Sequence, residues 1–249
     1  MNDFALPNCN SLQLWHAANT NDAEGPIEKR CWNWLSESEK DRLTQFKVIS
    51  NHNQHLIGRA MMRWLLSPDK SRLSEVQFDT EAQGKPFVKH PASSKRPFNL
   101  SHTDGLVLCA IGSLSHHHVG VDVERNDRST SPELAERYFS PPEITLLQQT
   151  TDEQIKRERF LRIWTLKEAF IKAIGTGLRT PLSHFAFKDI ESANPTIDFL
   201  EPNLDGQLEW HFHCFEPRRG FIASTATACS PSSKRPSLVS RDFESEVGI

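Results

Sequence analysis

Apolar positions recur along this chain with two different periods, one typical of strands and one typical of helices. In the segment 119–124 three valines alternate with a glycine and two carboxylates, Asp122 and Glu124. This period of two predicts a strand that buries its valines and carries both carboxylates on the other face. The segments 56–66 and 153–174 repeat their apolar residues every three to four positions and predict two long helices.

The predicted elements occur in the same order in both halves of the chain. Each half begins with a strand, continues through helices and ends with two strands that flank a turn. In each half one helix follows a Ser-x-x-Glu sequence, at 36–39 and at 140–143, which is the spacing of a capping box. We therefore predict an α+β fold of two similar lobes. The predicted divisions are 1–117, 118–229 and a polar, proline-rich tail, 230–249, that we expect to be mobile.

The long helices of the two halves also align weakly with each other. Placing 58–63 over 167–172 pairs Arg59 with Glu168 and Arg63 with Lys172. In this alignment one helix would present cations to an anionic substrate, while the other would present an acid and an amine. The alignment covers few positions, and helical sequences often match by chance.

Three carboxylates of the second half could meet around one cation. Asp122 and Glu124 share a strand face, and Glu168 stands four residues before Lys172 on a predicted helix. Like charges brought this close repel unless a proton or a metal intervenes. Oxygen ligands, with no cysteine or histidine at metal-ligand spacing nearby, favour a hard cation such as Mg²⁺. Taken one at a time, these motifs are more often an ordinary half-buried strand and a solvated ion pair.

A third motif supplies groups that suit an anion. Lys85 lies in a Gly-Lys-Pro sequence, and Ser101 and His102 stand just before an Asp-Gly pair at 104–105 that is a strong hairpin signal. Ser101 and His102 can donate hydrogen bonds to phosphate oxygens, and Lys85 adds a positive charge. A nucleophilic Ser-His dyad is disfavoured, because adjacent strand residues point to opposite faces.

In order and spacing, these motifs closely resemble the signature of the Sfp-type 4′-phosphopantetheinyl transferases. The matching segments are Gly84-Lys-Pro86, Phe98-Asn-Leu-Ser-His102, Val119-Gly-Val-Asp-Val-Glu124 and Trp164-Thr-Leu-Lys-Glu-Ala-Phe-Ile-Lys172. The chain length suits the two-lobed members of that family. The resemblance implies a pseudo-twofold pair of lobes with the site between them. It also implies an enzyme that transfers the phosphopantetheine arm of coenzyme A to a serine of an apo carrier protein, with release of 3′,5′-ADP.

The resemblance further implies a role for each matching residue. Glu168 would accept the serine proton, directly or through water, and Lys172 would stabilise the leaving phosphate or return a proton. Mg²⁺ would act on the pyrophosphate as Lewis acid and template. The implied metal ligands are Asp122, Glu124 and Glu168, and the implied coenzyme A contacts are Lys85, Pro86, Ser101, His102, Asp122 and, for the 3′-phosphate, Arg42 and Arg59.

Composition and charge limit where such a protein acts and what it binds. A chain of 249 residues with 37% apolar residues can bury a substantial core, and its net charge of -3 gives no case for nucleic-acid binding. No apolar run approaches the roughly 18 residues of a membrane span, and no leader is evident, so we expect a cytoplasmic protein without membrane contact, and a monomer. The five scattered cysteines suit reduced thiols. The three histidines at 116–118 are expected to form a solvated loop.

Two other functions remain open at this point. One is a coenzyme A or nucleotide-binding module without turnover, which needs the cations but not the carboxylates. The other is a Mg²⁺-dependent phosphohydrolase, in which water replaces the carrier serine.

The acceptor could be a fatty-acid, polyketide, peptide-synthetase or polyunsaturated-lipid carrier. Because such carriers are typically acidic, we expect a local basic patch, best supplied by 154–162, which could equally be a solvated helix face.

Overall fold

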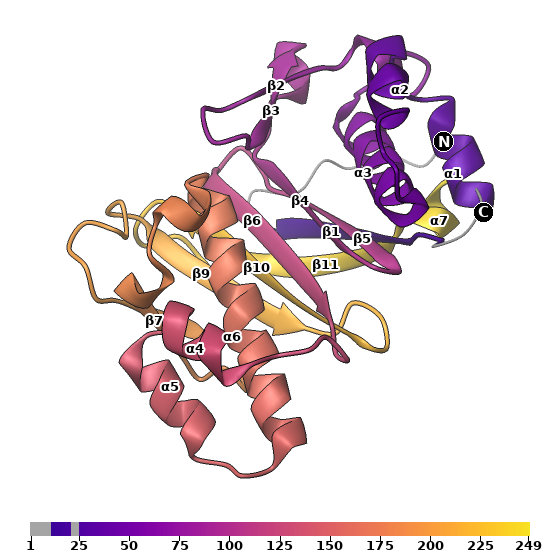
Figure 1. Cartoon of the computed structure of the whole chain (residues 1–249). Coiled ribbons are helices and arrows are strands. Elements are labelled where there is room, and N and C mark those ends of the chain that lie inside the picture. Colours follow the sequence, from indigo (N-terminus) through magenta and orange to yellow (C-terminus); the bar gives the residue numbers. More distant parts are fainter. Residues whose placement is uncertain (1–10, 21–24) are drawn as a thin grey trace.

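The computed structural model of this chain describes residues 11–20 and 25–249, which form two lobes that lie side by side (Figure 1). The N-terminal lobe contains β1 (Ser11–Ala18), α1 (Pro26–Trp32), α2 (Glu37–Leu43), α3 (Ile49–Leu66), β2 (Gln77–Thr80), β3 (Pro86–His90), β4 (Phe98–Thr103) and β5 (Leu106–Ile111). The C-terminal lobe contains β6 (His116–Arg125), α4 (Pro132–Tyr138), α5 (Pro141–Gln148), α6 (Glu153–Ile174), β7 (Phe185–Lys188), β8 (Thr196–Phe199), β9 (Glu209–Phe215) and β10 (Phe221–Cys229). The chain ends with β11 (Ser237–Asp242) and α7 (Phe243–Glu246).

Both lobes repeat one topology. The sheet order is β1-β5-β4 in the first lobe and β6-β10-β9 in the second, with antiparallel pairing throughout. In each lobe the first strand leads into helices, and the last of these is the longest, α3 or α6. Each lobe also carries a short hairpin, β2-β3 or β7-β8, that the sequence pattern did not reveal. The predicted α+β fold of two similar lobes is confirmed, while the lobe boundaries stay predictions.

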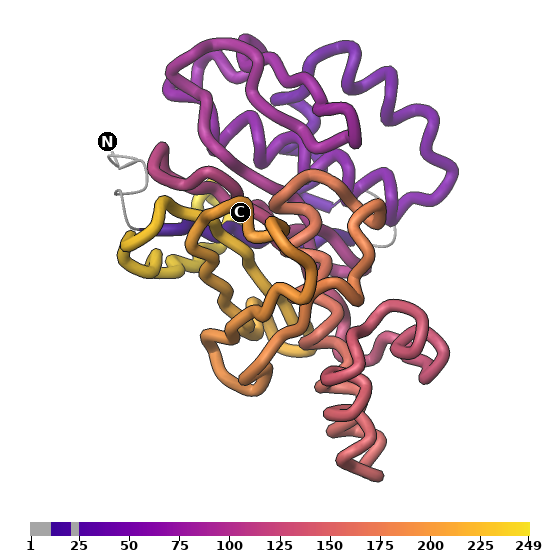
Figure 2. The backbone as a smooth tube through the Cα atoms, turned by 90° about the vertical axis from the view of Figure 1, so that its left-hand side faces the viewer, coloured from indigo at the N-terminus to yellow at the C-terminus, as the bar shows by residue number. Residues whose placement is uncertain are grey.

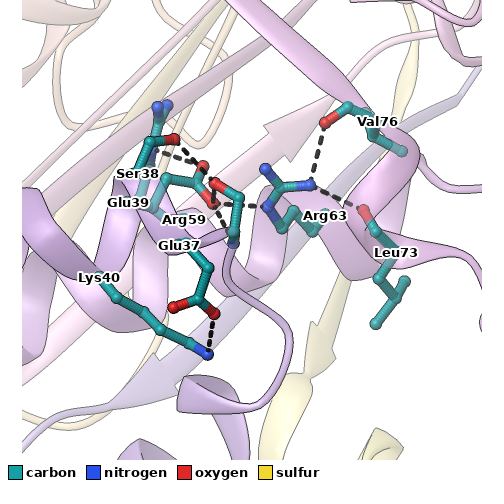
Figure 3. Close-up of polar contacts among 9 residues, drawn as sticks. Glu37, Ser38, Glu39, Lys40, Arg59, Arg63, Leu73 and Val76 are labelled. Atoms are coloured by element: carbon teal, nitrogen blue, oxygen red, sulfur yellow. Dashed lines mark hydrogen bonds and ion pairs between the residues drawn. The ribbon is translucent and has the colours of Figure 1, made fainter.

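One buried polar network shows how the first lobe is fixed (Figure 3). Arg63 of α3 is buried, and its Nε donates to Glu39 Oε2 at 2.7 Å. Its Nη1 donates to the backbone carbonyl oxygens of Leu73 and Val76 at 2.8 and 2.9 Å. Glu39 also closes the predicted capping box at the start of α2 by accepting from Ser36. Since every charge is paired, α3, α2 and the segment after α3 are held in one register.

The second lobe repeats this network with a lysine. Lys167 of α6 is fully buried, and its Nζ lies 2.8 Å from Glu143 Oε2. The same Nζ donates to the carbonyl oxygens of Leu182 and Phe185 at 2.6 and 2.7 Å. Arg63 of the first lobe therefore corresponds to Lys167, so the helix alignment predicted from the sequence is wrong. The predicted alignment is shifted by five positions, which is the separation of Lys167 from Lys172 in the sequence.

The alternating valines of β6 lie at the contact between the lobes. Val119, Val121 and Val123 are buried in one cluster with Leu14 and Leu108, which come from β1 and β5. The predicted burial of the valines is thus confirmed, and it leaves the other face of β6 to the active-site side chains. Among the described residues, no helix combines the length and the apolarity that crossing a membrane requires. The cysteines at 31, 109, 214 and 229 are free thiols, and Cys9 lies outside the described residues.

The C-terminal tail is a structural part of the first lobe, so its predicted mobility is wrong. β11 pairs in parallel with β1 and covers what would otherwise be an open sheet edge (Figure 1). Phe243 of α7 is fully buried and contacts the rings of Trp15 and Trp34 edge-on. Asp242 binds Arg218 of the second lobe at 2.8 Å. Backbone pairing and one buried aromatic ring hold the tail in place. Neither contact requires a long apolar pattern in the sequence of the tail.

The histidines at 116–118 begin strand β6, which corrects the predicted loop. His116 is buried, and its Nδ1 accepts a hydrogen bond from the Ser113 N–H at 3.0 Å. Burial, reinforced by His211, lowers the pKa of His116 to about 4. His213 of β9 is buried as well, and burial together with Arg235 and His211 lowers its pKa to about 4. Both rings are therefore neutral at pH 7.

We expect these two histidines to make the fold labile to acid. In the unfolded chain a histidine has a pKa near 6.5, so between about pH 6.5 and 4 the unfolded state binds more protons. Stability is then complete above pH 6.5 and falls as the pH drops, by roughly 2 to 3 kcal/mol per histidine. Urea unfolding at pH 7.5, 6 and 5 measures this loss. The double variant His116→Gln and His213→Gln should lose less stability between pH 7.5 and 5 than the wild type, and His117→Gln, at an exposed position, should not. A wild-type profile that is already flat would contradict this expectation.

Candidate active site

A cleft of about 470 Å³ lies between the lobes and is lined by most of the side chains that the sequence indicated. One wall comes from α3, β4 and the start of β3, and the other from β6 and α6. The predicted site residues that line it are Arg42, Arg59, Pro86, Ser101, His102, Asp122, Glu124 and Lys172. Two predicted residues, Lys85 and Glu168, are not part of the lining.

At the centre of the cleft three side chains from three elements form a closed triangle of contacts. Lys172 Nζ of α6 lies 2.6 Å from Asp122 Oδ1 of β6 and donates to Ser101 Oγ of β4 at 3.0 Å. Ser101 Oγ donates to the same Asp122 oxygen at 2.9 Å. Asp122 and Ser101 are buried, and Lys172 is partly exposed. The triangle joins both lobes and brings together residues that lie up to 71 positions apart.

Gly120 explains why α6 can approach β6 so closely. A Cβ at this position would overlap the Ala169 carbonyl oxygen and would lie 2.6 Å from Ala173 N. Only glycine leaves the helix backbone room to rest on the strand. Asp122, on the same face two residues later, is thereby brought beside Lys172.

Two carboxylates of the site are poorly compensated by their surroundings. Asp122 Oδ2 is buried without a hydrogen-bond partner among the described residues, although Oδ1 of the same group has two. Burial, followed by the negative charge of Asp122, raises the pKa of Glu168. Two partly desolvated acids in such proximity are chemically suited to a hard cation, which would supply the missing positive charge.

The third predicted metal ligand is otherwise engaged. Glu124 forms an ion pair with Arg128, which follows it by four residues. Among the described residues, no group of three or more acidic, histidine or cysteine side chains is gathered as a metal site. The predicted trio of Asp122, Glu124 and Glu168 is therefore brought into one region but is not assembled. A cation would fit here once Glu124 leaves Arg128.

The first lobe adds positive charge to the cleft. Arg42 and Arg59 line it, as does His55, which the sequence analysis missed. Burial, with the charges of Arg59, Arg42 and His102, lowers the pKa of His55 to about 4, and its Nε2 is buried with no hydrogen-bond partner in the described part of the chain. His55 precedes Arg59 by four residues on α3, and this helical spacing is the signal that could have identified it. Arg59 Nε lies 3.2 Å from Glu39 Oε1 (Figure 3).

Lys85 points away from the cleft and clamps the end of α6. Its Nζ donates to the carbonyl oxygens of Ala173 at 2.5 Å and of Val119 at 3.2 Å. Burial lowers the pKa of Lys85 to about 8. A cation at a helix C-terminus is favourable, and here it ties the hairpin of the first lobe to the helix of the second. The structure thus gives Lys85 a structural role, while its contact with coenzyme A stays a prediction.

We expect Lys85→Met to lower the free energy of unfolding by about 1 to 3 kcal/mol, because two carbonyl groups lose a charged donor. Urea denaturation measures this effect. Lys89→Met, on the strand that begins just after Lys85, is a matched control, since Lys89 is exposed and its one ion pair among the described residues is with Asp79. If Lys85→Met left stability unchanged and raised the KM for coenzyme A, the ammonium group would belong to the substrate site after all.

Both lobes of this chain are similar in sequence to known proteins. Residues 118–226 match the model of the 4′-phosphopantetheinyl transferase superfamily, and residues 28–113 match the model of the 4′-phosphopantetheinyl transferase N-terminal region. The chain is 31% identical to the 4′-phosphopantetheinyl transferase Sfp of Bacillus subtilis over 172 residues, which is 68% of this chain and 73% of Sfp. The chain therefore belongs to the 4′-phosphopantetheinyl transferase family, whose named members are enzymes.

Other relatives match over a smaller part of their length. The 4′-phosphopantetheinyl transferase HetI of Nostoc sp. is 37% identical over 58% of this chain and 61% of its own. The human L-aminoadipate-semialdehyde dehydrogenase-phosphopantetheinyl transferase is 32% identical over 72% of this chain and 62% of its own. The chain thus spans about three fifths of these two relatives. A crystal structure of the Thermotoga maritima holo-[acyl-carrier-protein] synthase aligns with a TM-score of 0.39 and 24% identity, over 46% of this chain and 64% of that one.

Proposed function

We propose that this protein transfers the 4′-phosphopantetheine arm of coenzyme A to a serine of an apo carrier protein and releases 3′,5′-ADP. The observation that carries the proposal is the cleft between the lobes, which is lined by the cations Arg42, Arg59 and Lys172 and by the carboxylates Asp122 and Glu124. Coenzyme A has phosphates for the cations and a reacting pyrophosphate for a metal ion held by the carboxylates. Family membership supports the same reaction class.

The carboxylates of the site suit a divalent cation, and we propose that this cation is Mg²⁺. Asp122 and Glu168 would hold it, and Glu124 would join them on release from Arg128. When bound, the ion supplies Lewis-acid stabilisation of the pyrophosphate and orients it. The buried, unpartnered Asp122 Oδ2 supports this assignment, because such an atom is costly unless it meets a positive charge.

The chain's own residues supply the proton transfers and the charge. Glu168 has a raised pKa, which makes it a stronger base near neutral pH than an ordinary glutamate. We assign to it the removal of the serine proton. Lys172, which contacts Asp122 and Ser101, would neutralise the leaving phosphate. Arg42, together with His55 and Arg59, would bind the phosphate that is remote from the reaction.

The carrier would dock beside the start of α6. Figure 2 shows α5 and the first turns of α6 projecting together from the second lobe. A second cleft, of about 350 Å³, lies there and combines apolar side chains such as Leu161 and Phe215 with Arg157. Arg157 has no ion-pair partner within the described part of the chain, whereas Arg159 and Arg162 each bind a glutamate. An exposed, unpaired cation beside apolar side chains suits an acidic helical partner.

We expect Lys156→Glu combined with Arg157→Glu to raise the KM for the carrier by about fivefold or more and to weaken the salt dependence of transfer. Coenzyme A affinity should stay unchanged, because the cleft that holds it is separate. Kinetics over an ionic-strength series measure both effects. The control is Lys188→Glu, on a strand outside both clefts. An unchanged carrier KM would place the docking surface elsewhere.

Intact-mass measurement of a panel of apo carriers, after incubation with the protein, coenzyme A and Mg²⁺, tests the proposal. Modification of one or more carriers, abolished by chelation, is the expected result. A phosphohydrolase would instead release phosphate with no carrier present. A binding module would retain coenzyme A without modifying any carrier.

A further inference from the structure

Arg128 follows β6 in the chain and contacts one residue of β6 and one of α6. Its guanidinium group forms an ion pair with Glu124 and lies 5.1 Å from the centre of the Trp164 ring. Its charge also acts on Glu168, whose pKa it lowers against the larger raising effects of burial and Asp122. Trp164 and Glu168 are one turn apart on α6, so they share a helix face. These contacts place the guanidinium among the carboxylates and above the aromatic ring.

The neighbouring arginine behaves differently. Arg125 binds Asp127 with two hydrogen bonds, of 2.8 Å from Nε and 2.5 Å from Nη2. It is therefore satisfied by a residue outside the carboxylate trio. Arg128, in contrast, pairs with a member of that trio, and Glu124 has no other ion-pair partner in the described residues. Of the two arginines, only Arg128 sits where a divalent cation would need to enter.

We propose that Arg128 is an internal counter-cation that holds Glu124 until a divalent cation displaces it. The inference rests on the proposed function, because it assigns Arg128 to the regulation of the same site. The guanidinium neutralises Glu124 in the absence of the ion, and its stacking on Trp164 adds to the cost of release. We call the ion pair of Arg128 with Glu124 the latch. The latch thereby sets the cation concentration at which the three carboxylates come together.

The surroundings provide a place for the released side chain. A cleft of about 430 Å³ adjoins Arg128 and is also lined by Asp104 and Asp127. The Arg128 side chain is about one third exposed, so it can rotate without opening the core. After displacement it would meet acidic groups in solvent, where ion pairs are worth little. Release therefore costs mainly the contacts with Glu124 and Trp164.

Binding of Mn²⁺ alone, with neither coenzyme A nor carrier present, tests the latch. The paramagnetic resonance signal of free Mn²⁺ gives the dissociation constant for the full-length protein. We expect Arg128→Gln to bind Mn²⁺ about five- to tenfold more tightly than the wild type, because no guanidinium competes. Arg125→Gln, the matched control, should stay within about twofold of the wild type, since Arg125 pairs outside the trio. In a Glu124→Gln background, Arg128→Gln should no longer change the affinity.

Equal or weaker Mn²⁺ binding by a folded Arg128→Gln variant overturns the latch. If circular dichroism shows that this variant is unfolded, Arg128→Met, which also removes the charge that pairs with Glu124, takes its place, and an affinity unchanged from the wild type overturns the latch in the same way. Carrier modification is measured on the same preparations. If the wild type modifies a carrier and the Arg128 variant has an unchanged Mn²⁺ affinity, the latch alone is refuted. If the wild type binds Mn²⁺ but modifies no carrier, the proposed function is refuted. Absence of Mn²⁺ binding in every variant overturns the latch and the metal dependence together.

Discussion

Replacing Glu168 with glutamine is expected to lower kcat for carrier modification by about 100- to 10,000-fold, the usual contribution of a general base. The amide keeps the size of the side chain but can neither accept the serine proton nor bind a cation as a carboxylate does. The raised pKa of Glu168, caused by burial and by Asp122, is the property that the variant removes. Single-turnover kinetics at saturating coenzyme A and carrier measure the loss.

Glu158→Gln is the matched control for this experiment. Glu158 lies on the same helix, but it is largely exposed and pairs with Arg162. It should leave kcat within about twofold, because an exposed ion pair contributes little. If Glu168→Gln kept full kcat while the KM for coenzyme A rose, Glu168 would serve binding only, and another group would have to take the proton.

Gly120→Ala should have the largest effect on stability. The added methyl group would collide with the backbone of α6 at Ala169 and Ala173, which cannot move aside as a flexible side chain can. We expect the free energy of unfolding to fall by about 3 kcal/mol or more, at the upper end of the range for overpacked sites. Activity should fall as well, because α6 carries Glu168 and Lys172. Urea unfolding and carrier modification measure the two losses.

Gly58→Ala provides the comparison for Gly120→Ala. A Cβ at Gly58 would make only ordinary contacts, the nearest at 3.7 Å from Leu100. Since alanine also favours the helical backbone of α3, stability should be unchanged or should rise by roughly 1 kcal/mol. A Gly120→Ala variant as stable as Gly58→Ala would show that α6 does not rest on β6 as closely as described here.

The sequence predicted the elements of the active site well where the signals were local. Strand β6, helix α6 and both capping boxes follow from short-range periodicity and cap spacing, and each is present in the structure. The contact of Ser101 with Asp122 was not predicted from the sequence. Such contacts between distant strands leave no local pattern from which they could be derived.

The remaining features depend on non-local contacts. The tail pairs with β1 from more than 200 residues away, and nothing in its own sequence specifies that partner. The packing of the two lobes directs Lys85 to the end of α6, and this contact could not be predicted from the residue type alone. Arg63 and Lys172 share a charge sign, which made the helix alignment plausible. Only the buried contacts of Lys167 reveal the true correspondence.

The most direct test of the proposed transferase measures two products of one reaction. The protein is incubated with coenzyme A, Mg²⁺ and an apo carrier, and both 3′,5′-ADP and the modified carrier are quantified. We expect one 3′,5′-ADP for each phosphopantetheine attached, with neither product when the carrier serine is replaced by alanine. Formation of 3′,5′-ADP or free phosphate at the same rate without an acceptor serine would contradict a transferase and would indicate hydrolysis.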